Sequence, residues 1–164
     1  RLNQIWVSDV TCFKLGELYL YTCVILDLFS RRVVAYKVSR KNSTQLITST
    51  FKAAWEQRAP DTGLIFHSDR GAQYTSHRFR QLLHERAVVQ SFSNSRKPHG
   101  NAVAESFFAT LKKEDLYRKD YTSEAAFKRG LASYIEFYST QRPHRTLKNL
   151  TPNQVEDAFM SDKS

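Results

Sequence analysis

Three acidic residues occupy positions at which a carboxylate could take part in catalysis. Asp9 interrupts an otherwise apolar, strand-like segment, Asp69 comes shortly after the apolar run 64–66, and Glu105 lies in the first turns of a helix-like segment. An unpaired carboxylate is costly to bury, and carboxylates brought together repel one another unless cations join them. Mg²⁺ prefers carboxylate and phosphate oxygens, and two such ions can activate the attacking oxygen and stabilise the leaving oxygen at phosphorus. A metal-dependent reaction on phosphodiesters would use this set of residues.

Each acid also has a plain structural interpretation when it is taken alone. Asp9 could cap a turn, Asp69 could hold the turn made with Arg70 and Gly71, and Glu105 could be a solvated surface residue. The helical periodicity after residue 101 favours a common function, because at 100° per residue Glu105 and Lys112 point the same way. The apolar residues on the roughly opposite side of that helix are Val103, Phe107 and Leu111.

The composition favours a basic globular domain with a polyanionic partner. The 164 residues include 25 Lys and Arg against 16 Asp and Glu, which gives a formal net charge of +9. Such a balance is typical of proteins that bind nucleic acid or an anionic membrane, although a basic protein without such a partner remains an alternative. No apolar run approaches the ~20 residues of a membrane span. Cys12 and Cys23 lie in apolar runs, so we expect small core residues of a reduced, intracellular protein.

Hydrophobic periodicity predicts a single α/β domain over residues 1–164. Strands are expected at 5–13, 18–28 and 33–38, joined by short turns into an antiparallel meander, and two short strands at 64–66 and 88–92. Helices are expected from Asn42 or Ser43 to before Pro60, from Ser76, from Asn101 as N-cap, from 123 to 138, and after the capping box that begins at Thr151. This order predicts one mixed sheet, with helices on its faces and with the later strands added through helical crossovers.

Several motifs, in order along the chain, resemble those of the DDE transposases of bacterial insertion sequences, which are relatives of retroviral integrases. The segments are 6–11 (WVSDVT), 19–31, 67–74 (HSDRGAQY), 101–108 (NAVAESFF) with 111–114 (LKKE), and 138–144 with 151–152. The 35 residues between Asp69 and Glu105 match the spacing of this group, as does Lys112, seven residues after Glu105. The likeness covers nearly the whole chain.

The resemblance implies a ribonuclease H-like fold, with a mixed five-stranded sheet flanked by helices. It implies that Asp9, Asp69 and Glu105 bind two Mg²⁺ or Mn²⁺ ions and catalyse cleavage at element ends, followed by joining of the freed 3′-hydroxyl to target DNA. The expected partners are both DNAs and further copies of the chain on paired ends, with no membrane. We expect a cytoplasmic bacterial protein that associates with the nucleoid when it binds DNA. Since the chain starts abruptly at Arg1, we expect a fragment that lacks an upstream DNA-binding region.

A second group of residues is expected to bind DNA. Its members are Lys112, Arg70, Gln73, Asn101, Arg96, Lys97, Arg142 and His144. The chain departs from the family pattern at Gly100, at Ser139 and in the loop 95–99, where the family has Asp, Asn and a loop rich in Gly and Cys. Two alternatives therefore stay open: a structure-selective nuclease of the same fold, which would not join strands, and a catalytically degenerate DNA-binding module.

Overall fold

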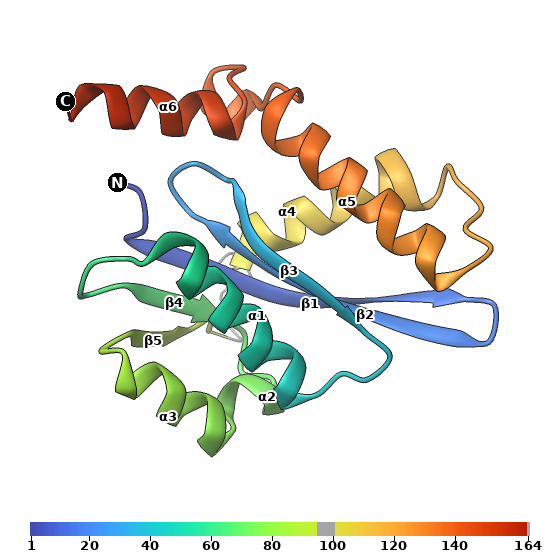
Figure 1. Cartoon of the computed structure of the whole chain (residues 1–164), viewed down its shortest axis with the longest axis horizontal. Coiled ribbons are helices and arrows are strands. Elements are labelled where there is room, and N and C mark those ends of the chain that lie inside the picture. The colour runs from blue at the N-terminus through green and yellow to red at the C-terminus, as the bar shows by residue number, and fades with distance from the viewer. Residues whose placement is uncertain (95–100, 164) are drawn as a thin grey trace.

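A five-stranded mixed sheet forms the centre of the fold, in the strand order β3-β2-β1-β4-β5 (Figure 1). The computed structural model describes residues 1–94 and 101–163. Strands β1 (Ile5–Leu15), β2 (Leu18–Asp27) and β3 (Val33–Ser39) pair antiparallel, whereas β4 (Ile65–Ser68) runs parallel to β1, and β5 (Val89–Phe92) runs parallel to β4. The predicted meander and the two crossovers are confirmed.

Helices cover both faces of this sheet. They are α1 (Thr44–Arg58), α2 (Ala72–Thr75), α3 (His77–Glu85), α4 (Ala102–Leu111), α5 (Glu124–Thr140) and α6 (Pro152–Asp162). A π-helix, η2 (Lys112–Leu116), continues directly from α4, and a short 3₁₀ helix, η3 (Arg145–Leu147), precedes α6. The sequence did not predict α2, η2 or η3. Among the described residues, no helix combines the length and the hydropathy that a membrane crossing requires.

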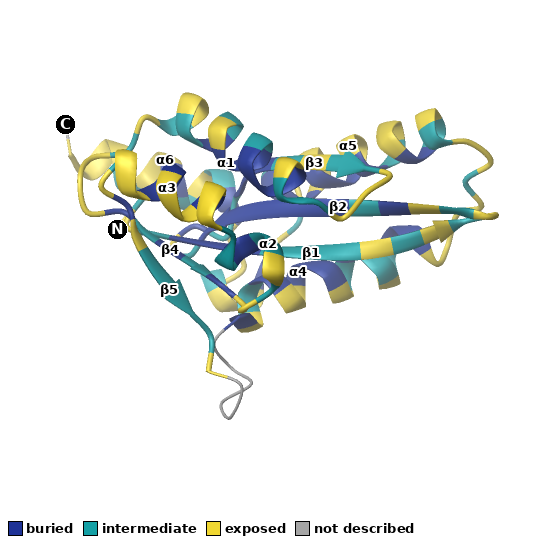
Figure 2. Cartoon of the chain, turned by 90° about the horizontal axis from the view of Figure 1, so that it is seen from below, coloured by how far each residue is buried: buried dark blue, intermediate teal, exposed yellow. Residues whose placement is uncertain are grey.

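Alternation along the strands produces two separate cores, one on each face of the sheet. Trp6 and Ile25 pack with Phe51 of α1 and Phe79 of α3, whereas Val7 and its neighbours on the opposite face pack against α4 and α5. Figure 2 shows buried residues along β2 and on the sides of α1 and α4 that face the strands. Where helices cover both sides of the sheet, the segments 6–8 of β1 and 23–26 of β2 are almost entirely removed from water.

Side-chain caps set the starts of most helices, as the sequence predicts. Ser43, Ser76 and Ser123 each accept a hydrogen bond from the backbone three residues ahead, and Thr151 forms a complete capping box with Gln154. Asn101 differs from the prediction. It occupies the N-cap position of α4, but its side chain makes no capping bond. Its Nδ2 instead donates to the carbonyl oxygen of Ser8, 3.1 Å away.

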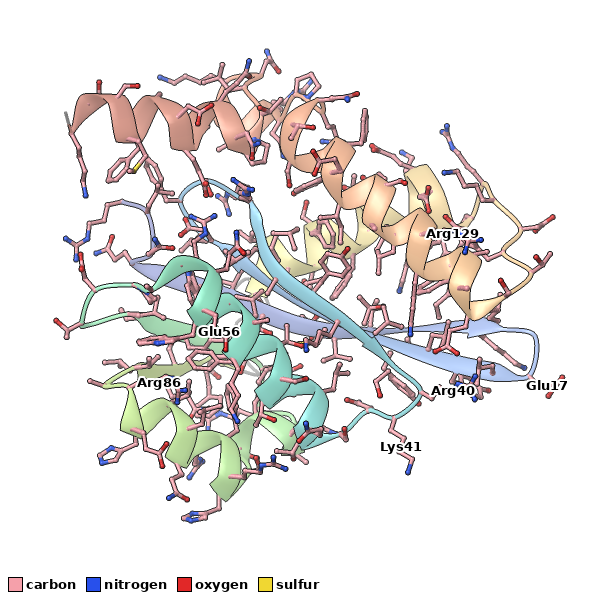
Figure 3. The ribbon with its side chains drawn as sticks, viewed as in Figure 1. Glu17, Arg40, Lys41, Glu56, Arg86 and Arg129 are labelled. Atoms are coloured by element: carbon pink, nitrogen blue, oxygen red, sulfur yellow. The ribbon has the colours of Figure 1, made fainter. Side chains whose placement is uncertain are left out.

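Charged contacts fix the peripheral elements to the sheet. The buried carboxylate of Glu156 in α6 accepts hydrogen bonds from Ser30, Arg32 and Arg58, at 2.8, 3.2 and 2.7 Å. Arg40, labelled in Figure 3, lies just beyond β3 and pairs with Glu124 at the start of α5, with 2.8 Å between Nη2 and Oε2. These pairs join segments that are distant in the chain.

The two cysteines differ from each other in burial. Cys23 lies in the core, as predicted, but Cys12 is exposed, so the prediction of two core cysteines is wrong for Cys12. Cys12 lies on the part of β1 that runs out into the hairpin with β2, and the helices cover this part less completely. The alternation of apolar residues along a strand does not show how far the helices that pack on that strand extend.

Candidate active site

Asp9 and Asp69 come from adjacent parallel strands. The β1–β4 ladder ends with the pair Val7–His67; Asp9 lies two residues further along β1, and Asp69 lies two residues after His67, directly past the end of β4. Parallel neighbours are separated by roughly 4.8 Å, so this register brings the two backbone positions to the same edge of the sheet. The carboxyl ends of such strands are the usual place for ligands in open α/β sheets.

The carboxyl of Asp9 experiences an unusual electrostatic environment. Burial, and then the neighbouring carboxylates of Asp69 and Glu105, raise the pKa of Asp9 to about 6. The backbone amide of Val10, which donates to Asp9 Oδ1 at 2.9 Å, and the ammonium of Lys112 act in the opposite direction. Asp9 is therefore close enough to both other acids to respond to their charge, and a bound cation would relieve this repulsion.

Asp69 is exposed and is held by the turn that leads into α2. Its Oδ1 accepts a hydrogen bond from the backbone amide of Gly71 at 2.8 Å. A Cβ atom at residue 71 would lie only 2.9 Å from that same oxygen. A side chain at residue 71 would therefore displace the carboxylate from its present position.

Glu105 reaches the same region from α4. The helix is fixed to the sheet by the fully buried residues Ala104 and Phe107, so that Glu105 remains exposed on its outer side. A pocket of about 480 Å³ is lined by Asp9, Glu105 and Lys112, together with Val10, Thr11, Phe108, Ala109 and Tyr117. The predicted common orientation of Glu105 and Lys112 is confirmed. Asp69 does not line this pocket; it lies in the turn between β4 and α2.

A buried hydrogen-bond network holds the segment of β1 next to Asp9 in place. The hydroxyl of Ser8 lies 2.8 Å from the carbonyl oxygen of Val24 and 2.9 Å from the hydroxyl of Tyr74. Since the single Ser8 hydrogen goes to the carbonyl, the Tyr74 hydroxyl donates to Ser8. With the Asn101 amide on the Ser8 carbonyl, this network connects β1 to β2, α2 and α4. The sequence did not identify Ser8, although a serine between apolar strand residues was a usable signal.

The residues predicted to bind DNA fall into different environments. Lys112 lies in the pocket, and the exposed Arg70 stacks its guanidinium over Phe92, 5.2 Å from the ring centroid. Gln73 donates from Nε2 to the carbonyl oxygen of Asn42 at 3.1 Å. Asn101 is 5% exposed, and its amide nitrogen is engaged by Ser8. The predictions for Arg96 and Lys97 lie outside the described residues.

Arg142 and His144 occupy positions that favour a structural role over the predicted phosphate contact. Arg142 forms a bidentate pair with Glu114, with Nε–Oε1 and Nη2–Oε2 distances of 2.9 and 2.8 Å. His144 is 6% exposed, stacks edge-on against Tyr138, and has its Nε2 3.1 Å from the Tyr138 carbonyl oxygen. A side chain enclosed in this way offers little surface to a phosphate. The Tyr138–Arg142–His144 signature thus connects the end of α5 to η2, which continues from the helix that carries Glu105.

The donor set fits hard divalent cations, although it is not a closed cage. Within residues 1–94 and 101–163, no three His, Cys, Asp or Glu side chains are gathered tightly enough to hold a metal ion by themselves. The oxygen donors, and the burial and repulsion that raise the pKa of Asp9, are nevertheless what Mg²⁺ or Mn²⁺ would complement. An open set of this kind leaves coordination positions for substrate phosphate oxygens.

Comparisons with known families match the chain over almost its whole length. One family model described as an integrase core domain matches residues 1–98, and a second with the same description matches residues 86–152. The putative transposase InsK of insertion element IS150 from Escherichia coli is 34% identical over 152 residues, which are 93% of this chain and 54% of that protein. The transposase of IS904 from Lactococcus lactis is 34% identical over 94% of this chain and 61% of its own length. The chain thus spans little more than half of the length of these relatives.

Solved structures agree on the fold. A chain of the simian T-cell lymphotropic virus intasome, in complex with a PP2A regulatory subunit, superposes with a TM-score of 0.79 at 18% identity, over 93% of this chain and 54% of that one. The integrase catalytic core domain of HTLV-2, solved in complex with magnesium, gives a TM-score of 0.73 at 18% identity, over 93% and 95% of the two chains. These similarities establish the ribonuclease H-like fold of retroviral integrase cores, as predicted.

Proposed function

Since the chain belongs to the integrase core domain family, with transposases of bacterial insertion sequences among its relatives, we propose that it is the catalytic domain of a DDE transposase. The observation that supports the proposal is that Asp9 and Glu105 line one pocket, while Asp69 follows the strand next to that of Asp9. Asp9 responds to the charges of both Asp69 and Glu105, and Lys112 supplies a cation beside them. A basic protein, with a net charge of +9, surrounds this acidic centre and favours binding of a polyanion.

The proposed reaction consists of two transfers at phosphorus. In the first, a water oxygen forms a bond to the phosphorus at the element end, and the bond to the 3′-oxygen breaks to leave a free 3′-hydroxyl. In the second, that hydroxyl oxygen attacks a phosphodiester of target DNA, whose own 3′-oxygen leaves with the proton. One P–O bond forms and one breaks in each step, so no covalent enzyme intermediate and no external energy source are needed.

The residues of the chain divide this work between them. Asp9, Asp69 and Glu105 would hold two Mg²⁺ or Mn²⁺ ions, which supply charge stabilisation and an activated oxygen nucleophile when bound. Lys112 is suited to hold a non-bridging phosphate oxygen, because its ammonium acts as a point charge beside the acids. The network of Ser8, Tyr74 and Asn101 keeps the Asp9 strand in place. Arg70, in the turn after Asp69, and Gln73, in α2, are further candidates for DNA contacts.

Assembly on paired DNA ends is part of the same proposal. The HTLV-2 core was solved in trimeric and dimeric forms, and the simian virus chain is part of an intasome. These similarities support a homo-oligomer of this chain on two element ends. The relatives come from bacteria, so the proposed place of action is bacterial cytoplasm, on nucleoid DNA.

A joining assay tests the proposal. The chain is incubated in Mn²⁺ with a precleaved element end carrying a free 3′-hydroxyl and with plasmid target DNA, in parallel with Asp69→Asn. We expect joined products with the wild type and a loss of at least about 100-fold with Asp69→Asn. Cleavage without joining would indicate a nuclease of the same fold instead. Salt-dependent DNA binding without any metal-dependent chemistry would indicate a degenerate binding module.

A further inference from the structure

Tyr117 is the most exposed large hydrophobic side chain among the described residues. It is 74% exposed, compared with 60% for Met160, 56% for Val89 and 49% for Tyr19. It is not on a remote surface, because it lines the pocket that also contains Asp9, Glu105 and Lys112. Within the described part of the chain, no hydrogen bond or ring contact occupies this side chain.

The π-helix explains how Tyr117 reaches this position. Its backbone amide donates to the carbonyl oxygen of Lys112, five residues earlier, at 2.9 Å. The wider turn places residue 117 above Lys112 on the same side of the helix. In a regular α-helix, Leu116 would take that place and Tyr117 would be rotated by about 100° away from it. Glu105, Lys112 and Tyr117 thus form one stripe along the outer side of α4 and η2. Single π-helical turns next to an α-helix recur at functional sites.

Two polar clusters hold the π-helix in this form. Glu114 is fixed by Arg142 and by the hydroxyl of Tyr134 at 3.0 Å. Asp115 is 3% exposed, and it accepts hydrogen bonds from Tyr121 at 2.5 Å and from Lys119 at 2.7 Å. Both residues that precede the buried Leu116 are therefore anchored, and the backbone presents Tyr117 at a fixed place beside the acids.

We propose that Tyr117 is a stacking platform for an unpaired base next to the phosphate that Lys112 would hold, beside the three acids. This inference rests on the proposed function and extends it to the state of the substrate, a DNA end whose last base pairs are opened. An exposed aromatic face stacks on any base, and Phe108 and Ala109 supply apolar pocket lining beneath it. The phosphate and the base belong to one nucleotide unit, which matches the adjacent placement of a cation and an aromatic ring on one stripe.

Equilibrium binding to two DNA ends tests the proposal. One end is fully paired, and the other carries two unpaired terminal nucleotides of the same sequence. We expect Tyr117→Ala to weaken binding to the unpaired end by about fivefold to hundredfold, with a much smaller loss on the paired end. Tyr117→Phe should bind like the wild type, because stacking needs the ring and not the hydroxyl. The matched control is Tyr19→Ala, an exposed tyrosine paired with Lys14 on the β1–β2 hairpin, which should change neither affinity.

The outcomes separate this inference from the proposed function. Equal losses on both ends, no loss with Tyr117→Ala, or no DNA binding by the wild type would overturn the stacking role. If the wild type joins strands and Tyr117→Ala keeps full selectivity for the unpaired end, only the stacking inference fails. If Tyr117→Ala loses that selectivity but the wild type shows no metal-dependent chemistry, the transposase proposal fails, and an end-binding role for Tyr117 remains. Circular dichroism checks that the variants fold.

Discussion

Asp9 in β1 and Asp69, which directly follows β4, each lie two residues beyond Val7–His67, the last register pair of these adjacent parallel strands. The β1–β4 pairing thus brings both residues to one edge of the sheet, and the Gly71 amide in the turn after β4 holds the Asp69 carboxylate. This placement has an electrostatic cost, because Asp9 is largely buried and its pKa is raised to about 6. The cost can be measured, and two predictions follow from it.

Asp9→Asn should stabilise the metal-free protein at neutral pH. The folded-state pKa of Asp9 lies above the unfolded value, so the folded state binds more protons between about pH 4 and pH 6. Stability from this group is present at low pH and is lost as the pH rises through that window, by at most about 3 kcal/mol. Urea unfolding in EDTA should therefore show a gain for Asp9→Asn at pH 7 that shrinks toward pH 4.5. A gain of equal size at both pH values would contradict the assignment.

Metal affinity should fall as this carboxyl takes up its proton. A bound cation requires the ionised form of Asp9, so protons and metal compete below about pH 6. We expect the apparent Mn²⁺ affinity, measured by titration calorimetry, to decrease about tenfold between pH 7 and pH 5. The Asp9→Asn variant, measured alongside, should bind more weakly and show a flatter pH dependence. An affinity that stays constant over this range would argue against Asp9 as a ligand.

Gly71→Ala should damage the site without unfolding the chain. The new methyl would lie 2.9 Å from Asp69 Oδ1, in a turn whose backbone conformation alanine can adopt, so the carboxylate must move. We expect joining activity to drop at least about tenfold, since small displacements of catalytic groups are costly, while the melting temperature changes little. Ala72→Ser, at the neighbouring exposed residue, is the control. Full activity in Gly71→Ala would mean that the Asp69 position seen here is not the one used.

The hydroxyl groups of Ser8 and Tyr74 should contribute to the free energy of unfolding in a coupled way. Tyr74→Phe removes the donor, and Ser8→Ala leaves the buried Tyr74 hydroxyl without its acceptor. We expect a loss of about 1 kcal/mol for the first and roughly 1–3 kcal/mol for the second, from chemical unfolding. A double-mutant cycle should give a coupling free energy of at least about 0.5 kcal/mol. Additive losses would show that the 2.9 Å contact contributes nothing.

Lys112 and Arg142 should differ in the salt dependence of DNA binding. Lys112→Gln removes a free cation from the pocket, so the slope of log affinity against log salt should fall by about 1. Arg142 is already neutralised by Glu114, so Arg142→Gln should leave that slope unchanged and instead lower thermal stability. If the slope falls by about 1 in Arg142→Gln, Arg142 contacts a phosphate as the sequence predicted, and the purely structural role described here is wrong.

Local patterns predicted much of this architecture. Apolar alternation identified β1 to β3, and serine and threonine caps identified most helix starts. Asp9 was singled out as an acid inside an apolar strand, and Asp69 as an acid just past the end of one. The features that were missed depend on tertiary partners. The Asn101 side chain does not cap α4, because it donates to the Ser8 carbonyl oxygen instead. The His144 ring packs against Tyr138 and is not exposed. The π-helix has no local propensity signature, because it is held by Arg142 and Tyr121 from outside the segment.

The attachment of α4 to the first strand also governs when the chain can act. Glu105 reaches Asp9 only after the two crossover units have folded and Ala104 has docked on the sheet. A nascent chain that has left the ribosome only as far as β5 carries two of the three acids but not the third. Chains truncated before α4 therefore lack one carboxylate of the proposed site, so the strand transfer proposed for this domain depends on synthesis of its later half.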